Sequence, residues 1–454
     1  MAGNKILLVN SRELCYYSGS FFLQQMCEAL RNVGEDVEYI SLSCEEDYIA
    51  FMDRVGKSYK AIIDINSQMP YMILEDESRL LNRIDAPFYN YIVDHPLYHH
   101  PGLVFPIDNY HAIGIDKRHV KYMKDYYPHL KSVGFLPMGA TEPSHRVDYK
   151  NRRIPLLLTA TYENEQGILQ DFRKLAAGLE EGRFDINYEG NYKQDAKAGE
   201  GAEPETGESV EPETGESLEL EIESAGSKMA YNNCGDVKLS GRGKLFYDLG
   251  MNLVEVMLSG PVERTMEECL ADIISQEDLM EGKFFTREFP VLMNYLFLID
   301  KYVRNVHRRR VVEEIVKSGQ EITVAGAGWE MTALGDYAKA NLIGQVQMMD
   351  VFELMGNAKT VLDINPLFSE GVHDRVTSAM AAGAYVISDM NVDALESDES
   401  IIGQYNILKL DKLQEALNHT ESEKADRAHR GYELYKKSYS WECQANNLLK
   451  LLKD

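Results

Sequence analysis

The sequence predicts an α/β protein made of two doubly wound, Rossmann-like domains that face each other across a cleft. Short apolar runs alternate with helix-patterned segments in the first third of the chain, and the same alternation returns at residues 321–325. Short buried strands separated by helices favour parallel sheets covered by helices. At 454 residues the chain is also too long for one ordinary hydrophobic core, so two domains are expected.

The N-terminal domain is expected to span residues 1–150. Its strand-like runs lie at residues 6–9, 37–41, 61–65, 88–93 and 112–115, with helical patterns at 19–32, 47–55 and 117–127. In doubly wound sheets, ligands lie beyond the carboxyl ends of the strands. The part of this domain expected to face a ligand therefore comprises residues 10–20, 66–67, 94–100 and 116.

The remaining chain is expected to complete a second Rossmann-like domain around two insertions. The parts, in chain order, are the start of that domain at 151–194, a disordered acidic repeat loop at 195–227, a helical insertion at 243–317, the main donor-binding part at 318–430 and a C-terminal helix at 431–454. This helix could return to the N-terminal domain. The loop is predicted because the heptapeptide EPETGES occurs twice in a run with too little apolar surface to order itself.

Composition and charge argue against several classes of function. Lys and Arg number 47 and Asp and Glu number 73, which gives a formal net charge of −26. A field of this sign argues against nucleic-acid binding and against attraction to an anionic membrane. The six cysteines form no CxxC pair, and no apolar stretch is long enough to span a bilayer. We therefore expect a cytoplasmic protein with reduced thiols and no stable membrane insertion.

Residues 365–383, with the sequence NPLFSEGVHDRVTSAMAAG, carry the strongest functional signal. Strand-like runs flank them at 360–364 and 385–388, so the order is strand, polar loop, helix and strand. A helix N-terminus offers free N–H groups and a positive dipole end to a phosphate. Arg375 adds a planar donor fork for phosphate oxygens, and Glu370 can accept hydrogen bonds from sugar hydroxyls. Together these groups indicate a nucleotide-sugar pocket.

Three parts of the chain resemble one enzyme family. They are residues 365–389, the segment FYNYIVDHPLYHH at 88–100, and the pair VAGAGWE at 324–330 with LTATYE at 158–163. These segments are similar to the GT-B glycosyltransferases, specifically the bacterial CgeB-like (spore-maturation) group of the glycosyl-transferases-group-1 superfamily. The resemblance implies a metal-independent transfer of a sugar from a nucleotide-diphosphate donor to an acceptor hydroxyl, with no cofactor beyond that donor. We favour a UDP-sugar, and the acceptor is left open between a glycan, a protein and a small molecule.

The resemblance also gives individual residues a role. Asp94 or His95 would act as general base or orient the sugar, and His373 would act on the leaving group. The residues expected to contact the donor are Asn365, Glu370, Gly371, Asp374, Arg375, Ser378, Gly326, Gly328 and Trp329. Those expected to bound the acceptor site or approach the diphosphate are Ser18, Gly19 and Ser20.

Some of these residues also have a purely structural interpretation. Trp329 could stack on the donor or be buried, and Asp94 with His95 could simply hold a turn. Gly371 is expected to serve the turn and close helix–strand packing, and to touch ligand only through its backbone. The basic residues of one predicted helix are expected to form a solvated face: Arg304, His307, Arg308, Arg309 and Arg310. The alternative is that they contact a phosphate of the acceptor or of the donor.

One position departs from the family pattern. Retaining members of the family carry a second glutamate eight positions after the first, and the equivalent position here is Ser378. A serine can accept a hydrogen bond from a ribose but brings no charge. The alternative hypothesis is therefore a catalytically silent sugar-nucleotide-binding or spore- or surface-associated protein that retains the fold.

Overall fold

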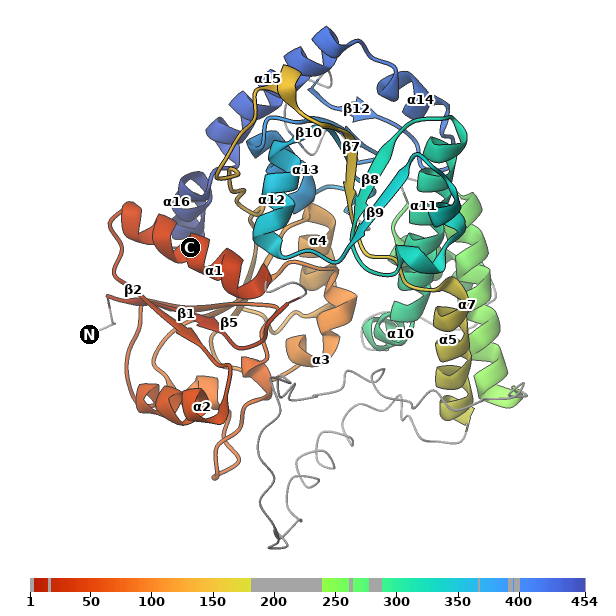
Figure 1. The fold of residues 1–454 in the computed structure, drawn as a ribbon. Coiled ribbons are helices and arrows are strands. Elements are labelled where there is room, and N and C mark those ends of the chain that lie inside the picture. The colour runs from red at the N-terminus through yellow and green to blue at the C-terminus, as the bar shows by residue number, and fades with distance from the viewer. Residues whose placement is uncertain are drawn as a thin grey trace, which may run out of the picture.

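The computed structural model describes residues 4–14, 18–180, 239–260, 264–276, 288–365, 368–390, 395 and 401–453. These residues form two parallel six-stranded sheets flanked by helices (Figure 1). The predicted α/β architecture of two doubly wound domains is confirmed. The acidic repeat predicted at 195–227 lies outside the described residues.

The N-terminal sheet has the strand order β2-β1-β3-β4-β5-β6. Its strands are β1 (Ile6–Asn10), β2 (Val37–Ser41), β3 (Ala61–Ile65), β4 (Phe88–Ile92), β5 (Tyr110–Gly114) and β6 (Ser132–Phe135). Its helices are α1 (Ser18–Asn32), α2 (Glu45–Phe51), α3 (His100–Leu103) and α4 (Lys117–Tyr126). Strands β1, β3 and β4 are buried along their whole length, which explains why their sequences show no alternation and are apolar except at Asn10, Asp64 and Asn90.

The C-terminal sheet has the strand order β12-β11-β10-β7-β8-β9. Its strands are β7 (Ile154–Thr159), β8 (Ile322–Ala325), β9 (Ala340–Gly344), β10 (Ala358–Leu362), β11 (Tyr385–Ser388) and β12 (Gly403–Gln404). Its helices are α12 (Met348–Gly356), α13 (Asp374–Ala381), α14 (Asp411–Leu417) and α15 (Glu421–Ser438). Strand β7 pairs with both β10 and β8, although a long helical segment separates β7 from β8 in the sequence.

That helical segment stands beside the C-terminal sheet and reaches the N-terminal domain. It consists of α5 (Glu165–Glu180), α7 (Gly241–Ser259), α8 (Met266–Gln276), α10 (Phe289–Tyr295) and α11 (Phe297–Lys317). Helix α5 packs on α7 and α11. The ring of Phe289 stacks on Tyr126 of α4 with 5.3 Å between centroids, so the segment shares a hydrophobic core with the first domain.

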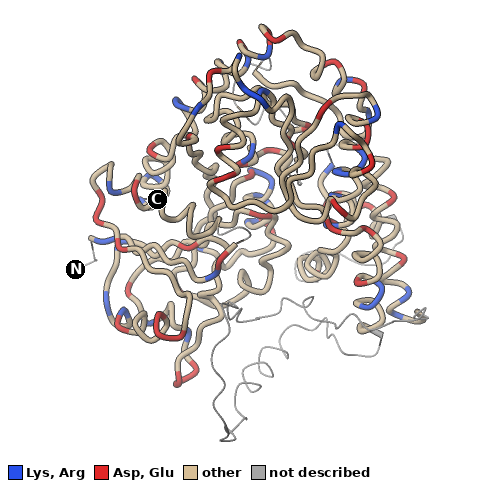
Figure 2. Tube along the Cα trace, viewed as in Figure 1, with Lys and Arg blue, Asp and Glu red and all other residues tan. Residues whose placement is uncertain are grey.

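The last helix, α16 (Trp441–Leu451), packs against α1 of the N-terminal domain (Figure 1). The ring of Trp441 lies so close to Gly139 that a Cβ atom there would be 2.4 Å from the indole. Figure 2 shows acidic and basic residues interspersed over both domains. No helix in the described part of the chain is long and apolar enough to cross a membrane.

Candidate active site between the domains

Two adjoining pockets lie between the domains. Their volumes are about 710 Å³ and 230 Å³, and both are lined by His95, Arg304 and Phe368. The predicted site residues on the larger pocket are His95, Asn365 and Glu370, and those on the smaller pocket are Ser18, Asp94, His95, His373 and Asp374. The structure therefore brings the end of β4 and the loop before α13 together from opposite domains.

The loop before α13 is bonded to the N-terminal domain through Asp116. The backbone N–H of Glu370 donates to Asp116 Oδ2 at 2.8 Å, and Gly371 forms an antiparallel bridge with Asp116. A Cβ atom on Gly371 would lie 2.6 Å from the carbonyl oxygen of Ile115. This glycine thus serves the close approach of the two domains, which corrects its expected role in helix–strand packing.

The carboxylate of Glu370 contacts an arginine of the N-terminal domain. Arg118 Nε donates to Glu370 Oε1 at 2.6 Å, and Arg118 Nη1 donates to Glu268 Oε1 at the same distance. The hydrogen bond and charge of these carboxylates raise the pKa of Arg118. Because Arg118 and Glu370 both line the larger pocket, this ion pair forms part of its wall.

Arg375, predicted to bind phosphate, pairs with a buried carboxylate of its own domain. Its Nη1 donates to Asp363 Oδ1 at 2.6 Å, and its Nε donates to Thr159 Oγ1 at 3.2 Å. Asp363 follows β10, has no exposed surface, and also accepts from Ser388 Oγ at 2.7 Å. Burial acts to raise the pKa of Asp363, but His373 and Arg375 hold it well below its usual range. The Asp363–Arg375 pair fastens α13 to the ends of the central strands.

His373 is the N-cap residue of α13 and lies between two carboxylates. Its Nδ1 accepts the backbone N–H of Arg375 at 3.3 Å and is 3.4 Å from Asp363 Oδ1. A neutral ring with an accepting Nδ1 carries its proton on Nε2, which lies 3.1 Å from Asp374 Oδ1. Since His373 and Asp374 both line the smaller pocket, the Nε2–H group is a hydrogen-bond donor at its wall.

Asp94 is an accessible carboxylate at the end of β4. Its side chain is 57% exposed, although it lines the smaller pocket. Asn66 Nδ2 donates to Asp94 Oδ2 at 2.8 Å, and His99 Nε2 lies 3.7 Å from the same oxygen. Partial withdrawal of the carboxylate from water acts to raise the pKa of Asp94, but His99, Arg304 and Asn66 together lower it. Asp94 is therefore ionised at neutral pH and can accept a proton.

His95 is engaged on both ring nitrogens. Its Nδ1 accepts the backbone N–H of Leu97 at 3.1 Å, so the proton of the neutral ring lies on Nε2. That Nε2 is 3.5 Å from Glu267 Oε2, and His95 is only 5% exposed. No lone pair is left to accept a proton, so the geometry favours Asp94 over His95 as a base.

Trp329 is a core residue of the C-terminal domain. It is 1% exposed, its Nε1 donates to the Ala160 carbonyl at 2.6 Å, and the ring of Tyr162 lies 5.2 Å from it. The preceding glycines permit this packing, because a Cβ atom would lie 2.1 Å from Ala160 O at Gly326 and 1.8 Å from Tyr162 O at Gly328. Of the two alternatives for Trp329, the structure shows burial.

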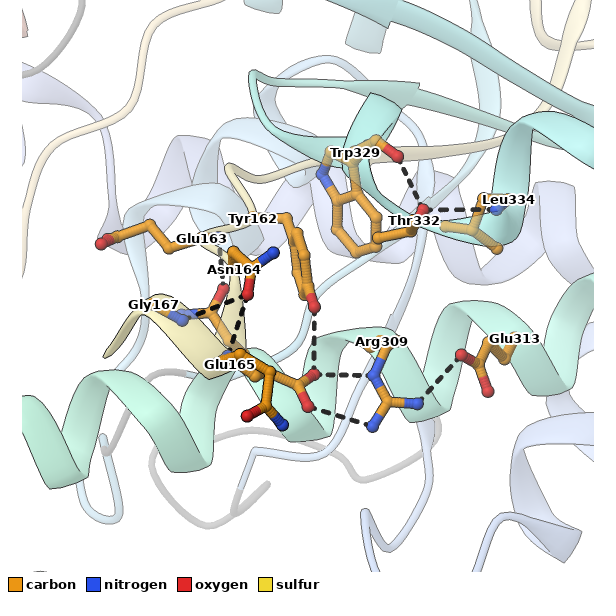
Figure 3. Close-up of polar contacts among 12 residues, drawn as sticks. Tyr162, Glu163, Asn164, Glu165, Gly167, Arg309, Glu313, Trp329, Thr332 and Leu334 are labelled. Atoms are coloured by element: carbon orange, nitrogen blue, oxygen red, sulfur yellow. Dashed lines mark hydrogen bonds and ion pairs between the residues drawn. The ribbon is translucent and has the colours of Figure 1, made fainter. Parts of the chain in front are cut away.

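The expectation of a solvated basic face on α11 is wrong for three residues. Arg304, His307 and Arg308 line the larger pocket, and Arg304 also lines the smaller one. Arg309 instead pairs with Glu165 and Glu313, as Figure 3 shows, and Arg310 is exposed. Arg304 and Arg308 are four positions apart, about one helical turn, so the sequence could have indicated that their side chains lie on the same side of the helix.

Several other predicted residues do not line either pocket. Ser378 lies inside α13 and is 4% exposed. Gly19 and Ser20 begin α1, where the Ser20 N–H donates to Glu13 Oε1 at 3.1 Å.

No group of three or more His, Cys, Asp or Glu side chains in the described part of the chain could hold a metal ion.

Residues 304–450, less than half of the chain, match a family model described as glycosyl transferase-like. No curated protein matches the sequence. Among solved structures, an α-glucosyltransferase in complex with UDP and a 13-mer DNA shows 10% identity over 100% of both chains, with a TM-score of 0.50.

Two further solved structures are similar at lower TM-scores. Sucrose-phosphate synthase from Thermosynechococcus elongatus shows 10% identity over 99% of this chain and 98% of its own, with a TM-score of 0.48. T4 phage BGT in complex with its UDP-glucose substrate shows 11% identity over 99% of each chain, also with a TM-score of 0.48. The likeness to the α-glucosyltransferase shows a shared fold, so the two facing sheets form the GT-B fold that the sequence predicted.

Proposed function

We propose that this protein is a glycosyltransferase that moves a sugar from a nucleotide-diphosphate donor to an acceptor hydroxyl. The observation that carries the proposal is the smaller pocket, where Asp94 of the N-terminal domain and His373 of the C-terminal domain form parts of one wall. The larger pocket adjoins it and shares Arg304 with it, so a donor and an acceptor could meet at that junction. The similarity of residues 304–450 to a glycosyl transferase-like family supports the same activity.

In the proposed reaction, Asp94 acts as general base. The acceptor oxygen forms a bond to the anomeric carbon of the donor, the bond from that carbon to the diphosphate oxygen breaks, and the acceptor proton passes to Asp94. The lowered pKa of Asp94 keeps it ionised, and its 57% exposure leaves it accessible to an acceptor. The Nε2–H group of His373 would stabilise the negative charge that develops on the departing diphosphate.

The donor and the setting are also part of the proposal. The similar α-glucosyltransferase was solved with UDP, and we propose a UDP-hexose donor for this chain, used without a metal ion. The acceptor would be a glycan, a protein or a small molecule. Nucleic acid is disfavoured by the net charge of −26. We further place the chain in the cytoplasm and in the CgeB-like group, on the family motifs at 88–100 and 365–389.

The experiment measures release of nucleoside diphosphate from a panel of nucleotide sugars and acceptors, with and without a chelator. Asp94→Asn should lower turnover by about 10²- to 10⁴-fold, the usual contribution of a general base. Asp108→Asn is the matched control, because Asp108 is exposed and lies outside both pockets. Loss of turnover in the presence of the chelator would contradict metal independence. Binding of UDP-sugars without turnover in any combination would instead support the silent-protein alternative that Ser378 suggests.

A further inference from the structure

Helix α11 places positive charge in the larger pocket. Arg304, His307 and Arg308 lie three or four positions apart, on one side of the helix, and all line the pocket. Burial, followed by the charge of Arg310, lowers the pKa of His307 to about 4, so the positive charge comes from the two arginines. The sequence indicated a solvated face for them, with contact to an acceptor or donor phosphate as the alternative. Whether they act on a ligand depends on whether the protein already neutralises their charge.

Most arginines near the pocket have a carboxylate partner. Arg309 pairs with Glu165 at 2.7 Å and Glu313 at 3.0 Å (Figure 3). Arg304 Nη2 lies 2.8 Å from Asp300 Oδ2 and donates to Tyr98 OH at 2.6 Å. These charges are compensated by the protein itself.

Arg308 is different. Its Nη1 donates to the carbonyl oxygen of Thr161 at 2.8 Å, and no carboxylate of the described residues forms an ion pair with it. Burial, followed by the nearby charges of Arg304 and Arg375, lowers the pKa of Arg308 to about 9, although the charges of Asp300 and Asp363 act to raise it. Arg308 is half-buried, and a cation withdrawn from water without a counter-ion is costly, so the pocket carries a positive charge that an anion would stabilise.

Two further groups make the pocket suited to an anion. Among the buried polar atoms, Arg304 Nε and His307 Nδ1 have no hydrogen-bond partner. Burial, with help from Asp363, raises the pKa of Asp389 in the same pocket to about 8. Asp389 is therefore mostly protonated at neutral pH and adds little negative charge that would repel a phosphate.

We propose that Arg308, with Arg304 and His307 beside it, forms the subsite that binds the diphosphate of the nucleotide donor. The assignment of the diphosphate to a donor rests on the proposed function, whereas the presence of an oxyanion site rests on the side chains of α11. In this assignment Arg375 orients α13 and leaves direct contact with the phosphates to Arg308.

The test uses the full chain and inorganic pyrophosphate or UDP as the probe, with binding measured by calorimetry. Arg308→Gln should weaken binding of both probes by about tenfold to a hundredfold, because it removes charge-assisted hydrogen bonds. Arg308→Lys should restore part of the affinity. Arg310→Gln is the matched control, since Arg310 lies on the same helix but is exposed, and its affinity should equal that of the wild type.

Three outcomes decide the assignment. Wild-type affinity in Arg308→Gln, or no binding of either probe by the wild type, would overturn it. Loss of pyrophosphate binding in a variant that keeps the melting temperature of the wild type would support it. If the wild type shows no transferase turnover but binds pyrophosphate, and Arg308→Gln loses that binding, the oxyanion site is supported and the proposed function fails.

Discussion

Replacing Arg375 by alanine should destabilise the folded protein strongly, even without a ligand. The carboxylate of Asp363 would stay buried without the guanidinium that contacts it at 2.6 Å. Solvent screens this pair little, because Asp363 is 0% and Arg375 is 11% exposed. Removing one partner of a buried ion pair costs about 3–5 kcal/mol. In a domain of this size that loss lowers the melting temperature by roughly 6–20 °C.

The pH dependence of the variant should identify the cause. In the folded wild type, the pKa of Asp363 is lower than in the unfolded chain. Ionised Asp363 therefore stabilises the folded state at pH values above the unfolded pKa, and this contribution is lost as the pH falls through the folded pKa. In Arg375→Ala, burial remains while one charge that lowered the pKa is gone. If the pKa of Asp363 then exceeds the unfolded value, the folded state binds more protons, and lowering the pH from 8 to about 5 should restore part of the lost stability.

The assay is urea denaturation at both pH values, followed by tryptophan fluorescence, with Trp329 reporting on this domain. The set comprises the wild type, Arg375→Ala, Asp363→Asn and the double variant. The double variant should be more stable than the sum of the single losses predicts, because it no longer buries an unpaired charge. If Arg375→Ala stays within about 0.5 kcal/mol of the wild type, as for a surface substitution, the assigned role of the pair is refuted.

Two further predictions concern other parts of the molecule. Gly371→Ala should lower the free energy of unfolding by about 1–3 kcal/mol through overpacking, since the added Cβ would lie 2.6 Å from Ile115 O. The control is Gly335→Ala, where no atom lies within 4 Å of the added Cβ, and it should lower the stability less. Equal melting temperatures of the two variants would contradict the contact between the domains. Burial lowers the pKa of His100 to about 3, below its unfolded value near 6.5. Between these two pH values the unfolded state binds more protons than the folded state, so the protein loses stability as the pH is lowered from about 6.5 to about 3. His100→Gln should flatten this decline in acid denaturation curves, and an unchanged slope would remove His100 as its source.

The fold was largely predictable because buried parallel strands leave a strong signal. Runs such as residues 6–9 and 61–63 are apolar without alternation, which few other structures require. The two-residue strand β12 carries no such signal, and neither do the contacts that join α10 to the first domain. These contacts depend on residues far apart in the sequence, where periodicity gives no information.

The site was predictable in its location but less so in its individual contacts. Strand ends and the loop before α13 were expected to face a ligand, and Asp94 and His373 do line one pocket. The partner of Arg375 was not foreseeable, because Asp363 looked like the end of a strand rather than a counter-ion. Arg304 and Arg308 were interpreted as surface residues because a polar helix face usually points to solvent. Only the three-dimensional packing of α11 against the cleft turns that face inward.

The contrast between Arg375 and Arg308 gives a general criterion for this pocket. A cation whose charge is matched by the protein stabilises the empty state, so its removal should lower stability before any ligand is added. A half-buried cation without a carboxylate partner destabilises the ligand-free protein, and its removal should leave stability unchanged or higher while ligand affinity falls. Arg375 belongs to the first kind through Asp363, and Arg308 to the second through its contact with a carbonyl oxygen alone. The two arginines should therefore shift the melting temperature of the ligand-free protein differently when replaced, and this difference separates a structural cation from a ligand-binding one.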